Sequence, residues 1–386
     1  MKYLELETFN DFVCVGSECP FTCCGGGWNI FIDDDTDRYY RTVTGEMGDR
    51  LRNGIQRKNG KTSFVLDEHN NCPFLNKKGL CDIYLSLGEE HLSNTCKYYP
   101  RYAFRSGDIV FTGVSISCPE VSKFFLTHKE PLLIDFSEDE TATDCEELIE
   151  WSIFNWAVRV FTQAVEIAQN RNLRIKDRMA LIILFVYQFQ THVDNGTDCK
   201  PVIDLFSDTS HYSDLLNEMQ IDNRDYGSKI DFCSELLNYF GSIDNLEMFL
   251  PELNELKRHF SKPENTNIEP EQWIVAFSWM DREENNIQRE QLLVYVLFRY
   301  LMKDYSKKAF FDKLMIGLEL VFVMSDCITA LMYIENGSFA ESDERILQIS
   351  HISRLIEHDF ELGNKVLEYF KTKGICELPF VLKLIS

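Results

Sequence analysis

The sequence predicts a mainly α-helical protein in which a small, cysteine-rich α+β domain precedes an all-α helical body. Eight of the 13 cysteines fall within the first 118 residues of a 386-residue chain. From about residue 145 onward, apolar residues recur at the three- and four-residue spacings of amphipathic helices. Hydrophobic residues make up 45% of the chain, so folded cores are expected despite a formal net charge of −23.

Residues 1–128 form the predicted cysteine-rich domain, since glycine, cysteine and turn signals interrupt short apolar runs there. Residues 29–32 and 109–111 are predicted as strands because glycine or aspartate bounds each run. Residues 33–53 are predicted as a helix that begins with aspartates and a threonine. Residues 129–144 are acidic and contain Pro131, which predicts a linker between the two parts.

The helical body is predicted to span residues 145–386. Its helices are expected at residues 146–169, 176–192, 226–240, 245–260, 288–303, 309–333 and 343–358. The most apolar stretch, residues 314–334, contains Glu319 and Asp326, which favours a buried helix over a membrane span.

Charge and composition exclude some classes of function. The acidic balance argues against a nucleic-acid binder and would attract a lysine-rich partner at long range, although solvation of the surface is its simplest meaning. The first residues show no basic segment followed by an apolar run, so a cytoplasmic protein without disulfides is expected. Neither a dinucleotide-binding glycine motif nor a hydrolase motif is present.

The clustered cysteines predict a metal or iron–sulfur centre. They are Cys14, Cys19, Cys23, Cys24, Cys72, Cys81, Cys96 and Cys118, with about four expected per centre. Thiolates are soft ligands that suit zinc and iron–sulfur clusters. The glycines at positions 25–27 would let the backbone wrap closely and offer N–H groups to cluster sulfurs.

Several alternatives remain open at this stage. A structural zinc site usually shows two close Cys-x2-Cys pairs, which are missing, and the Cys-x3-Cys-x2-Cys motif of radical enzymes fails at Gly26. His69 or His91 could replace a thiolate. The other cysteines (Cys145, Cys199, Cys233, Cys327 and Cys376) are predicted as core residues. His351 and His358 lie seven residues apart, and surface or core positions are expected for both.

The cysteine pattern resembles the CxxCxxCC family of iron- or zinc-chelating proteins and, more closely, the flagellin lysine-N-methylases. The resemblance rests on residues 19–28, 71–75, 79–81, 92–96, 99–101 and 117–120. These residues cover the first third of the chain. Cys14 departs from the shorter family pattern and is the least secure of the predicted ligands.

The resemblance implies methylation of flagellin lysines by S-adenosylmethionine in the cytoplasm, with a [4Fe–4S] cluster that takes part in cofactor binding or methyl transfer. Residues near the cysteines are candidates to line the site: Tyr98, Tyr99, Tyr102 and Glu120 for catalysis, and Gly25, Gly26, Gly27, Trp28 and Arg101 for cofactor binding. A desolvated aromatic pocket would favour the neutral amine that attacks a methyl sulfonium, and Arg101 could pair with the cofactor carboxylate. A radical route is the other mechanistic option.

Two non-catalytic functions compete with this hypothesis. Zinc or a cluster could staple a loop-rich binding module. Alternatively, exposed thiols could exchange between ligation and disulfide in a redox sensor. A nucleic-acid partner and a membrane span are not expected.

Overall fold

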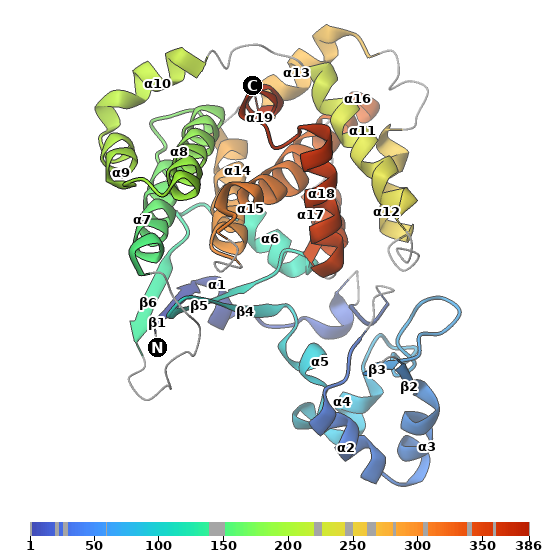
Figure 1. Ribbon diagram of the computed structural model, residues 1–386. Helices are drawn as coiled ribbons and strands as arrows, with labels where there is room; N and C mark the ends of the chain where they lie inside the picture. The colour runs from blue at the N-terminus through green and yellow to red at the C-terminus, as the bar shows by residue number, and fades with distance from the viewer. Residues whose placement is uncertain are drawn as a thin grey trace.

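The computed structural model describes residues 2–19, 23–25, 30–58, 60–138, 151–219, 226–243, 250–260, 268–280, 283–303, 308–337, 342–357 and 360–385. Within these ranges a four-stranded sheet, a small cysteine-bearing lobe and a large array of helices make up the protein (Figure 1). The mainly α fold with a small α+β N-terminal region is therefore confirmed.

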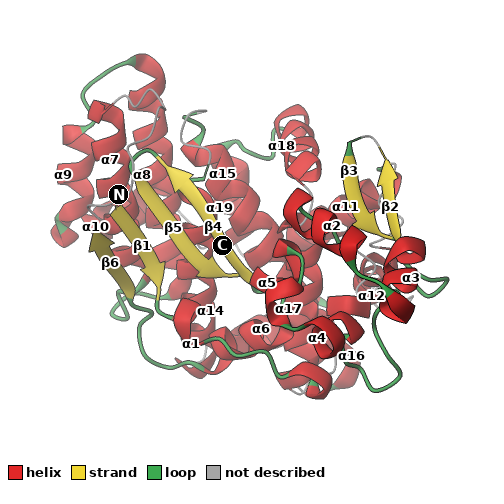
Figure 2. Cartoon of the chain, turned by 90° about the horizontal axis from the view of Figure 1, so that it is seen from below, coloured by secondary structure: helices red, strands yellow, loops and turns green. Residues whose placement is uncertain are grey.

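The larger sheet has the strand order β4-β5-β1-β6 (Figure 2). Its strands are β1 (Lys2–Leu6), β4 (Arg101–Ser106), β5 (Ile109–Val114) and β6 (Ile134–Glu138). Strand β1 is parallel to β5 and antiparallel to β6, so the start of the chain lies inside the sheet. Strand β5 extends the strand predicted at residues 109–111. Strand β6 lies within the segment predicted as a linker, residues 129–144. The last part of that segment, residues 139–144, is outside the described ranges.

Residues 30–98, which we call the cysteine lobe, project from the sheet at the lower right of Figure 1. The lobe contains a second, two-stranded sheet of β2 (Ile55–Lys58) and β3 (Lys61–Phe64). Its helices are α2 (Asp34–Thr42), α3 (Gly45–Gly54), α4 (Asp82–Leu87) and α5 (Asn94–Tyr98). A small core of its own, which includes Tyr40, Phe64, Cys72 and Phe74, holds these elements together.

Two predicted elements in this region were wrong. Instead of a strand at residues 29–32, only Phe31 forms a bridge, to Ser63, among the described residues 30–32. Residues 33–53 form two helices rather than one, because Val43 and Thr44 adopt extended backbone angles. Helix α3 then packs against that break, since a Cβ added at Gly48 would lie 2.1 Å from the Val43 carbonyl oxygen.

The described part of residues 151–385 is helical. Its longer helices are α7 (Trp151–Ala168), α8 (Ile175–Asn195), α9 (Lys200–Ser207), α10 (Tyr212–Met219), α11 (Tyr226–Ser242), α12 (Leu250–Phe260), α13 (Pro270–Met280), α14 (Glu283–Val296), α15 (Phe310–Gly317), α16 (Met324–Asn336), α17 (Ser342–Glu357), α18 (Phe360–Lys373) and α19 (Leu378–Ile385). Helix α7 begins at Trp151 in the described ranges, and residues 145–150 lie outside them. Helices α9, α10, α13, α18 and α19 were not predicted.

One large core joins the four-stranded sheet to the helical body. Phe111 on β5 packs against Phe161 of α7 and against Phe298 of the π-helical segment η7 (Leu297–Leu301), which follows α14, with ring centroids 5.6 and 5.4 Å apart. Helix α6 (Pro119–Thr127) lies between α14 and α17. The sheet and the helices are therefore one packed unit, and a boundary at residues 129–144 stays a prediction.

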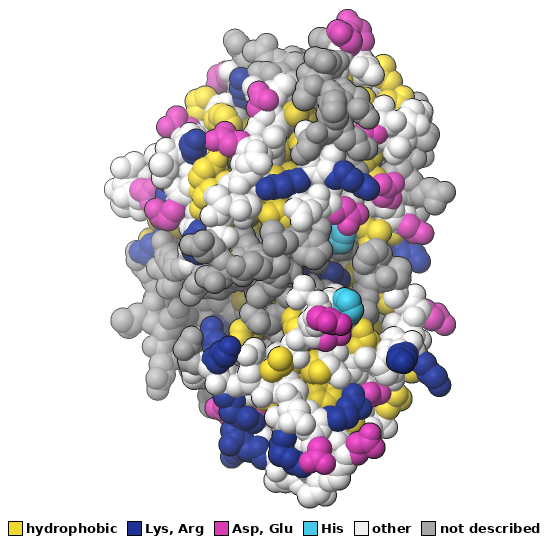
Figure 3. All heavy atoms as spheres, turned by 90° about the vertical axis from the view of Figure 1, so that its right-hand side faces the viewer, with side chains coloured by type: hydrophobic (Ala, Val, Ile, Leu, Met, Phe, Trp, Pro, Cys, Tyr) yellow, Lys and Arg dark blue, Asp and Glu magenta, His cyan; other side chains and the backbone are white. Residues whose placement is uncertain are grey.

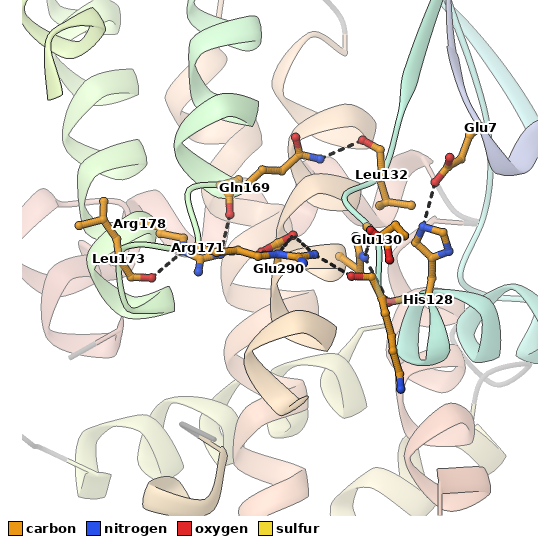
Figure 4. Close-up of polar contacts among 12 residues, drawn as sticks. Glu7, His128, Glu130, Leu132, Gln169, Arg171, Leu173, Arg178 and Glu290 are labelled. Carbon is orange, nitrogen blue, oxygen red and sulfur yellow. Dashed lines mark hydrogen bonds and ion pairs between the residues drawn. The ribbon is translucent and has the colours of Figure 1, made fainter. Parts of the chain in front are cut away.

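A buried ionic cluster fastens the segment after α6 to the body (Figure 4). Glu290 on α14 has a side chain only 1% exposed and pairs with Arg178 at 2.8 Å and Arg171 at 2.9 Å. Arg171 also donates to the Lys129 carbonyl at 2.8 Å. Gln291 donates to the carbonyls of two further residues of that segment, His128 and Glu130, at 3.2 and 2.6 Å. These bonds fix the chain where it returns from α6 to β6.

The apolar helix Phe310–Asn336 is long and apolar enough to cross a membrane, but 94% of its hydrophobic window is buried inside the protein. It contains the π-helical segment η9 (Leu318–Val323) and crosses α14 closely. A Cβ at Gly317 would lie 2.7 Å from a Val296 methyl carbon, so glycine permits this approach. A buried core helix was predicted here.

The scattered cysteines and histidines lie mainly in the interior. Cys199, Cys233 and Cys327 are buried and Cys376 is half-buried, while Cys145 lies outside the described residues. His351 is buried on α17, and His358 lies outside the described residues.

Candidate functional site

Four of the eight N-terminal cysteines gather on the core of the cysteine lobe. Cys72 is a buried member of that core, and Cys24, Cys81 and Cys96 pack against it from three other segments. The Cys72 amide donates to the Cys24 carbonyl at 2.7 Å, which ties the two chain segments together.

Local backbone structure sets the positions of these four residues. Cys81 caps the N-terminus of α4 and forms a bridge with Leu75. Cys96 lies in the first turn of α5, where its amide donates to the hydroxyl of the N-cap residue Ser93 at 3.4 Å. The positive end of a helix dipole favours a thiolate over a thiol at such positions.

The remaining four cysteines are not part of the lobe core. Cys118 caps the N-terminus of α6 and belongs to the large core rather than to that of the lobe. Cys14 is exposed and accepts a hydrogen bond from the Gly16 amide at 3.4 Å, while the Cys19 amide donates to the Gly16 carbonyl at 3.2 Å. Cys23 lies next to Cys24 in the turn η2 (Cys23–Gly25).

A hydrogen bond with Cys24 raises the pKa of Cys23, and burial and the charges of Cys24, Cys96 and Cys14 raise it further, so the thiols of the two groups lie close together. Burial, together with the charges of Cys24 and Cys81, raises the pKa of Cys96 to about 12, while a hydrogen bond with Ser93 opposes this shift. Burial likewise raises the pKa of Cys118 to about 11, but its thiol neighbours are Cys19 and Cys14.

Burial raises the pKa of Cys72 and of Cys81 as well, and the charge of Cys24 raises both further. Backbone N–H groups oppose these shifts by bonding to sulfur, that of Phe74 to Cys72 and those of Tyr84 and Ile83 to Cys81. Such N–H···S bonds tune thiolate-ligated metals.

The donor set matches a soft metal, although the described side chains do not surround a common point. Thiols with backbone N–H groups aimed at them suit zinc or an iron–sulfur cluster. Among the residues that the structure describes, no three Cys, His, Asp or Glu side chains are arranged to hold one metal ion. His69 is exposed, and the His91 ring stacks on Tyr39 at 3.9 Å.

Arg101 holds the segment that leads to Cys14. Its guanidinium donates to the carbonyls of Phe9 at 3.0 Å and Phe12 at 2.8 Å. It also lies 5.4 Å from the centre of the Phe12 ring. In this structure Arg101 therefore positions the N-terminal loop. Of the other predicted cofactor-binding residues, Gly25 ends η2, and Gly26, Gly27 and Trp28 lie outside the described residues.

The predicted catalytic candidates occupy different environments. Tyr98 is exposed, and Glu120 lies half-buried in the first turn of α6. Tyr99 shares a hydrogen bond of 3.2 Å with the Ser117 hydroxyl. Burial raises the pKa of Tyr99, and the charges of Cys118 and Cys23 raise it further. Tyr99 therefore lies close to Cys118 and Cys23.

Tyr102 faces the helical body from β4. Its ring lies 3.9 Å from the Arg299 guanidinium, and its buried hydroxyl has no hydrogen-bond partner among the described residues. The residue opposite on β5 is Gly113, where a Cβ would lie 2.7 Å from that hydroxyl. Glycine at this position makes room for the phenol.

A buried carboxylate, Glu357, is the centre of a polar network beside these tyrosines. Its side chain is 1% exposed and accepts hydrogen bonds from Tyr295 at 2.7 Å, Tyr300 at 3.1 Å and Ser115 at 2.7 Å. Arg299 completes the network with an ion pair of 3.4 Å. Burial raises the pKa of both tyrosines, and the carboxylate raises it further.

This network reaches the cysteines through the short segment between β5 and α6. Ser115 bonds Ser117 through their hydroxyls at 2.8 Å. The Arg354 guanidinium donates to the Ser117 carbonyl at 3.1 Å. Cys118 follows directly, so the helical body fixes the backbone that carries this thiol.

Comparison with known proteins shows the family to which the chain belongs. A family model described as the FliB lysine N-methylase C-terminal domain matches residues 162–384, more than half of the chain. The chain belongs to the FliB lysine N-methylase family. Curated relatives agree, since the chain is 30% identical over 132 residues to the flagellar biosynthetic protein FliU of Salmonella muenchen and covers 76% of it.

Two longer relatives carry the family's name. The lysine-N-methylases of Salmonella typhimurium strain LT2 and Salmonella choleraesuis strain SC-B67 are each 30% identical to the chain over 132 residues, about a third of their length. No solved structure matches the chain.

In this FliB-family chain, sequence reasoning missed the residues around Glu357. Tyr295, Arg299 and Tyr300 fall within one apolar helical run, and a helical periodicity cannot tell a buried polar contact from a core position. The one available signal was an arginine between apolar neighbours in the segment Leu297–Leu301, which must find a partner when buried.

Proposed function

We propose that this protein is a lysine N-methyltransferase that uses S-adenosylmethionine and acts on flagellin in the cytoplasm. Membership of the FliB lysine N-methylase family is the observation that carries the proposal. The buried Tyr–Arg–Glu network, which reaches the segment before Cys118 through Ser115 and Ser117, supports it.

Methyl transfer by displacement needs a neutral lysine amine. The nitrogen lone pair forms a bond to the methyl carbon, the carbon–sulfur bond breaks, and its electron pair stays on sulfur. The lysine then releases a proton. A dry environment lowers an amine pKa, which favours the attacking form. The buried hydroxyl of Tyr102 and the carboxylate of Glu357 are the polar groups that we propose for orienting such an amine.

The thiols of the N-terminal cysteines would hold the [4Fe–4S] cluster that the family resemblance implies. When bound, the cluster supplies an iron that can accept a donor atom of the cofactor or exchange one electron. Cys118 connects that centre to the Glu357 network through Ser115 and Ser117.

The charge distribution fits a lysine-bearing protein substrate. Within residues 30–98 there are ten Lys or Arg and eleven Asp or Glu, so nearly all of the net charge of −23 lies outside the cysteine lobe. Figure 3 shows the side of the protein that lies to the right in Figure 1, and Lys and Arg side chains gather over its lower part, where the lobe lies. A lysine-rich surface would therefore be steered toward the helical body.

Anaerobically purified protein tests the proposal. It should bind S-adenosylmethionine and methylate lysines of purified flagellin, as read by mass spectrometry, while an unrelated lysine-rich protein stays unmodified. Equal modification of both proteins would refute flagellin as the substrate. If a metal is bound but neither the cofactor nor methyl transfer can be detected, the protein is a structural metal module.

A further inference from the structure

Strand β6 is the outermost strand of the four-stranded sheet (Figure 2), and no other strand of the described residues pairs with its outer side. The Glu7 amide donates to the Leu133 carbonyl at 3.1 Å, which sets the hydrogen-bond alternation of this antiparallel pair. Every second residue from Leu133 onward therefore bonds to β1, whereas the backbone groups of Ile134, Phe136 and Glu138 point away from the sheet. Such a row of N–H and C=O groups is a template on which another extended chain can pair.

The side chains of β6 leave this edge accessible. Phe136 is 57% exposed, and Leu133, directly before the strand, is 61% exposed. The carboxylates of Asp135 and Glu138 are exposed and form no ion pair with a described residue. Proteins usually protect an open edge with lysine, proline or a bulge, and β6 contains none of these.

The sequence around this edge is strongly acidic. Residues 130–158 contain nine Asp or Glu and no Lys or Arg. Two copies of β6 would therefore repel each other if they paired edge to edge. A strand of alternating lysine and apolar residues would instead place lysines beside Asp135 on one face of the sheet and apolar side chains beside Phe136 on the other.

We propose that the outer edge of β6 binds an extended, lysine-bearing segment of flagellin as a fifth strand of the sheet. The name of this partner rests on the proposed function, whereas the open edge and its charge are features of the chain itself. The added strand would lie three strand spacings, or about 14 Å, from β5, which leads to Ser115 and Cys118. An extended chain covers this distance in about four residues, so the paired segment and the methylated lysine are separate parts of the substrate.

A peptide of alternating lysine and valine residues tests the edge without assuming the reaction. Hydrogen exchange at the amides of Ile134, Phe136 and Glu138, read residue by residue by mass spectrometry, should be fast in the free protein. It should slow at least tenfold when this peptide is added, whereas a peptide of alternating glutamate and valine should have no effect. Slow exchange in the free protein would show that another part of the chain covers the edge and would overturn the proposal, as would equal responses to the two peptides.

Two variants alter different parts of the edge. Phe136→Pro removes an outward N–H group without removing a hydrogen bond to β1, and the double change Asp135→Lys, Glu138→Lys reverses two exposed charges. Each should weaken binding of the lysine–valine peptide and of purified flagellin at least tenfold. Asp214→Lys with Glu218→Lys, at exposed positions of α10, changes the net charge equally and should bind as the parent does. Parent-like binding by either edge variant, or an equal loss in the α10 control, contradicts the proposal.

Activity separates this proposal from the proposed function. If the edge binds flagellin but no methyl group is transferred, only the proposed function fails. If the peptide binds and flagellin does not, flagellin is refuted as the substrate while the edge still binds lysine-bearing strands. If the edge variants methylate flagellin with the KM of the parent, the function stands and the docking edge is refuted. A dimer in solution that Phe136→Pro dissociates would show that a second copy occupies the edge, which also refutes the proposal.

Discussion

Glu357→Gln tests whether the buried network serves the reaction as well as the fold. The substitution keeps the shape of the side chain but removes its charge. Arg299, whose side chain is only 10% exposed, then loses its ion-pair partner. The hydroxyls of Tyr295 and Tyr300, which donate to the carboxylate of Glu357, then face an amide that has only one acceptor oxygen. Glu290→Gln is the matched control, because Glu290 is equally buried and pairs with the 4% exposed side chain of Arg178.

Both substitutions should lower stability by a similar amount. Removing one partner of a buried ion pair costs about 3 to 5 kcal/mol, because the remaining charge is left desolvated. The pair of Glu290 is closer, at 2.8 Å against 3.4 Å for Glu357. The longer ion pair of Glu357 is offset by the three hydroxyl groups that donate to it, because each of these hydrogen bonds contributes about 1 kcal/mol to stability.

The two variants should differ in activity. Glu357 bonds Ser115, which lies three residues before Cys118, whereas Glu290 fastens the chain around Lys129. With stability measured by urea unfolding and methylation measured well below the unfolding temperature, Glu357→Gln should lower kcat/KM at least tenfold. Glu290→Gln should stay within about twofold of the parent. Equal losses of activity, or a cost below 1 kcal/mol for Glu357→Gln, would refute the reasoning.

Three further predictions concern single residues. Gly113→Ala should cost about 1 to 3 kcal/mol because the new methyl would overlap both the hydroxyl and the ring carbon Cζ of Tyr102, and a second change, Tyr102→Ala, which removes both atoms, should abolish most of this added cost in urea unfolding. If the second change restores nothing, the overlap is not the cause. Arg101→Met should cost about 2 kcal/mol and speed alkylation of Cys14, because two hydrogen bonds that hold its loop are lost; an unchanged alkylation rate would contradict this. Burial and then the charge of Arg354 lower the pKa of His351 from 6.5 to about 4. Between these two pH values the imidazole is protonated in the unfolded chain and neutral in the folded one. Stability should therefore fall by up to about 3 kcal/mol as pH drops from 6.5 to 4, and His351→Gln should flatten this part of the profile; the same slope in the variant would show that other groups cause it.

Much of the fold was accessible from the sequence because helical periodicity is a local signal. The apolar run at residues 309–333 indicated the buried helix that the structure places at Phe310–Asn336. Strand β1 was not predicted, since its partner residues, such as Phe111 opposite Leu4, lie more than 100 residues later. The break at Val43 was missed because its extended backbone depends on packing against α3.

The candidate site could be predicted only where residue type carries the chemistry. Cysteine clustering predicts the metal ligands, and this stays a prediction, whereas the placement of Cys72 and Cys118 in two different cores depends on long-range packing. Tyr102 was selected for its closeness to the cysteines in sequence, while Arg299 and Glu357 come from helices brought together by the fold. For Arg101 the residue type was a poor guide. It was expected to pair with the cofactor carboxylate, but in the structure it donates to two backbone carbonyls.

The hydrogen bonds from Arg101 to Phe9 and Phe12 also bring together the two ends of one long segment, residues 13–100, which lies outside the four-stranded sheet. The polypeptide leaves the sheet after β1 and α1 (Thr8–Asp11) and re-enters it at β4, which β5 separates from β1 in the strand order. Residues 13–100 are thus an insertion with paired junctions, and the sheet and helices are continuous without it. Exchange of this segment between members of the family would need to match those two junctions and the contact of Tyr99 with Ser117.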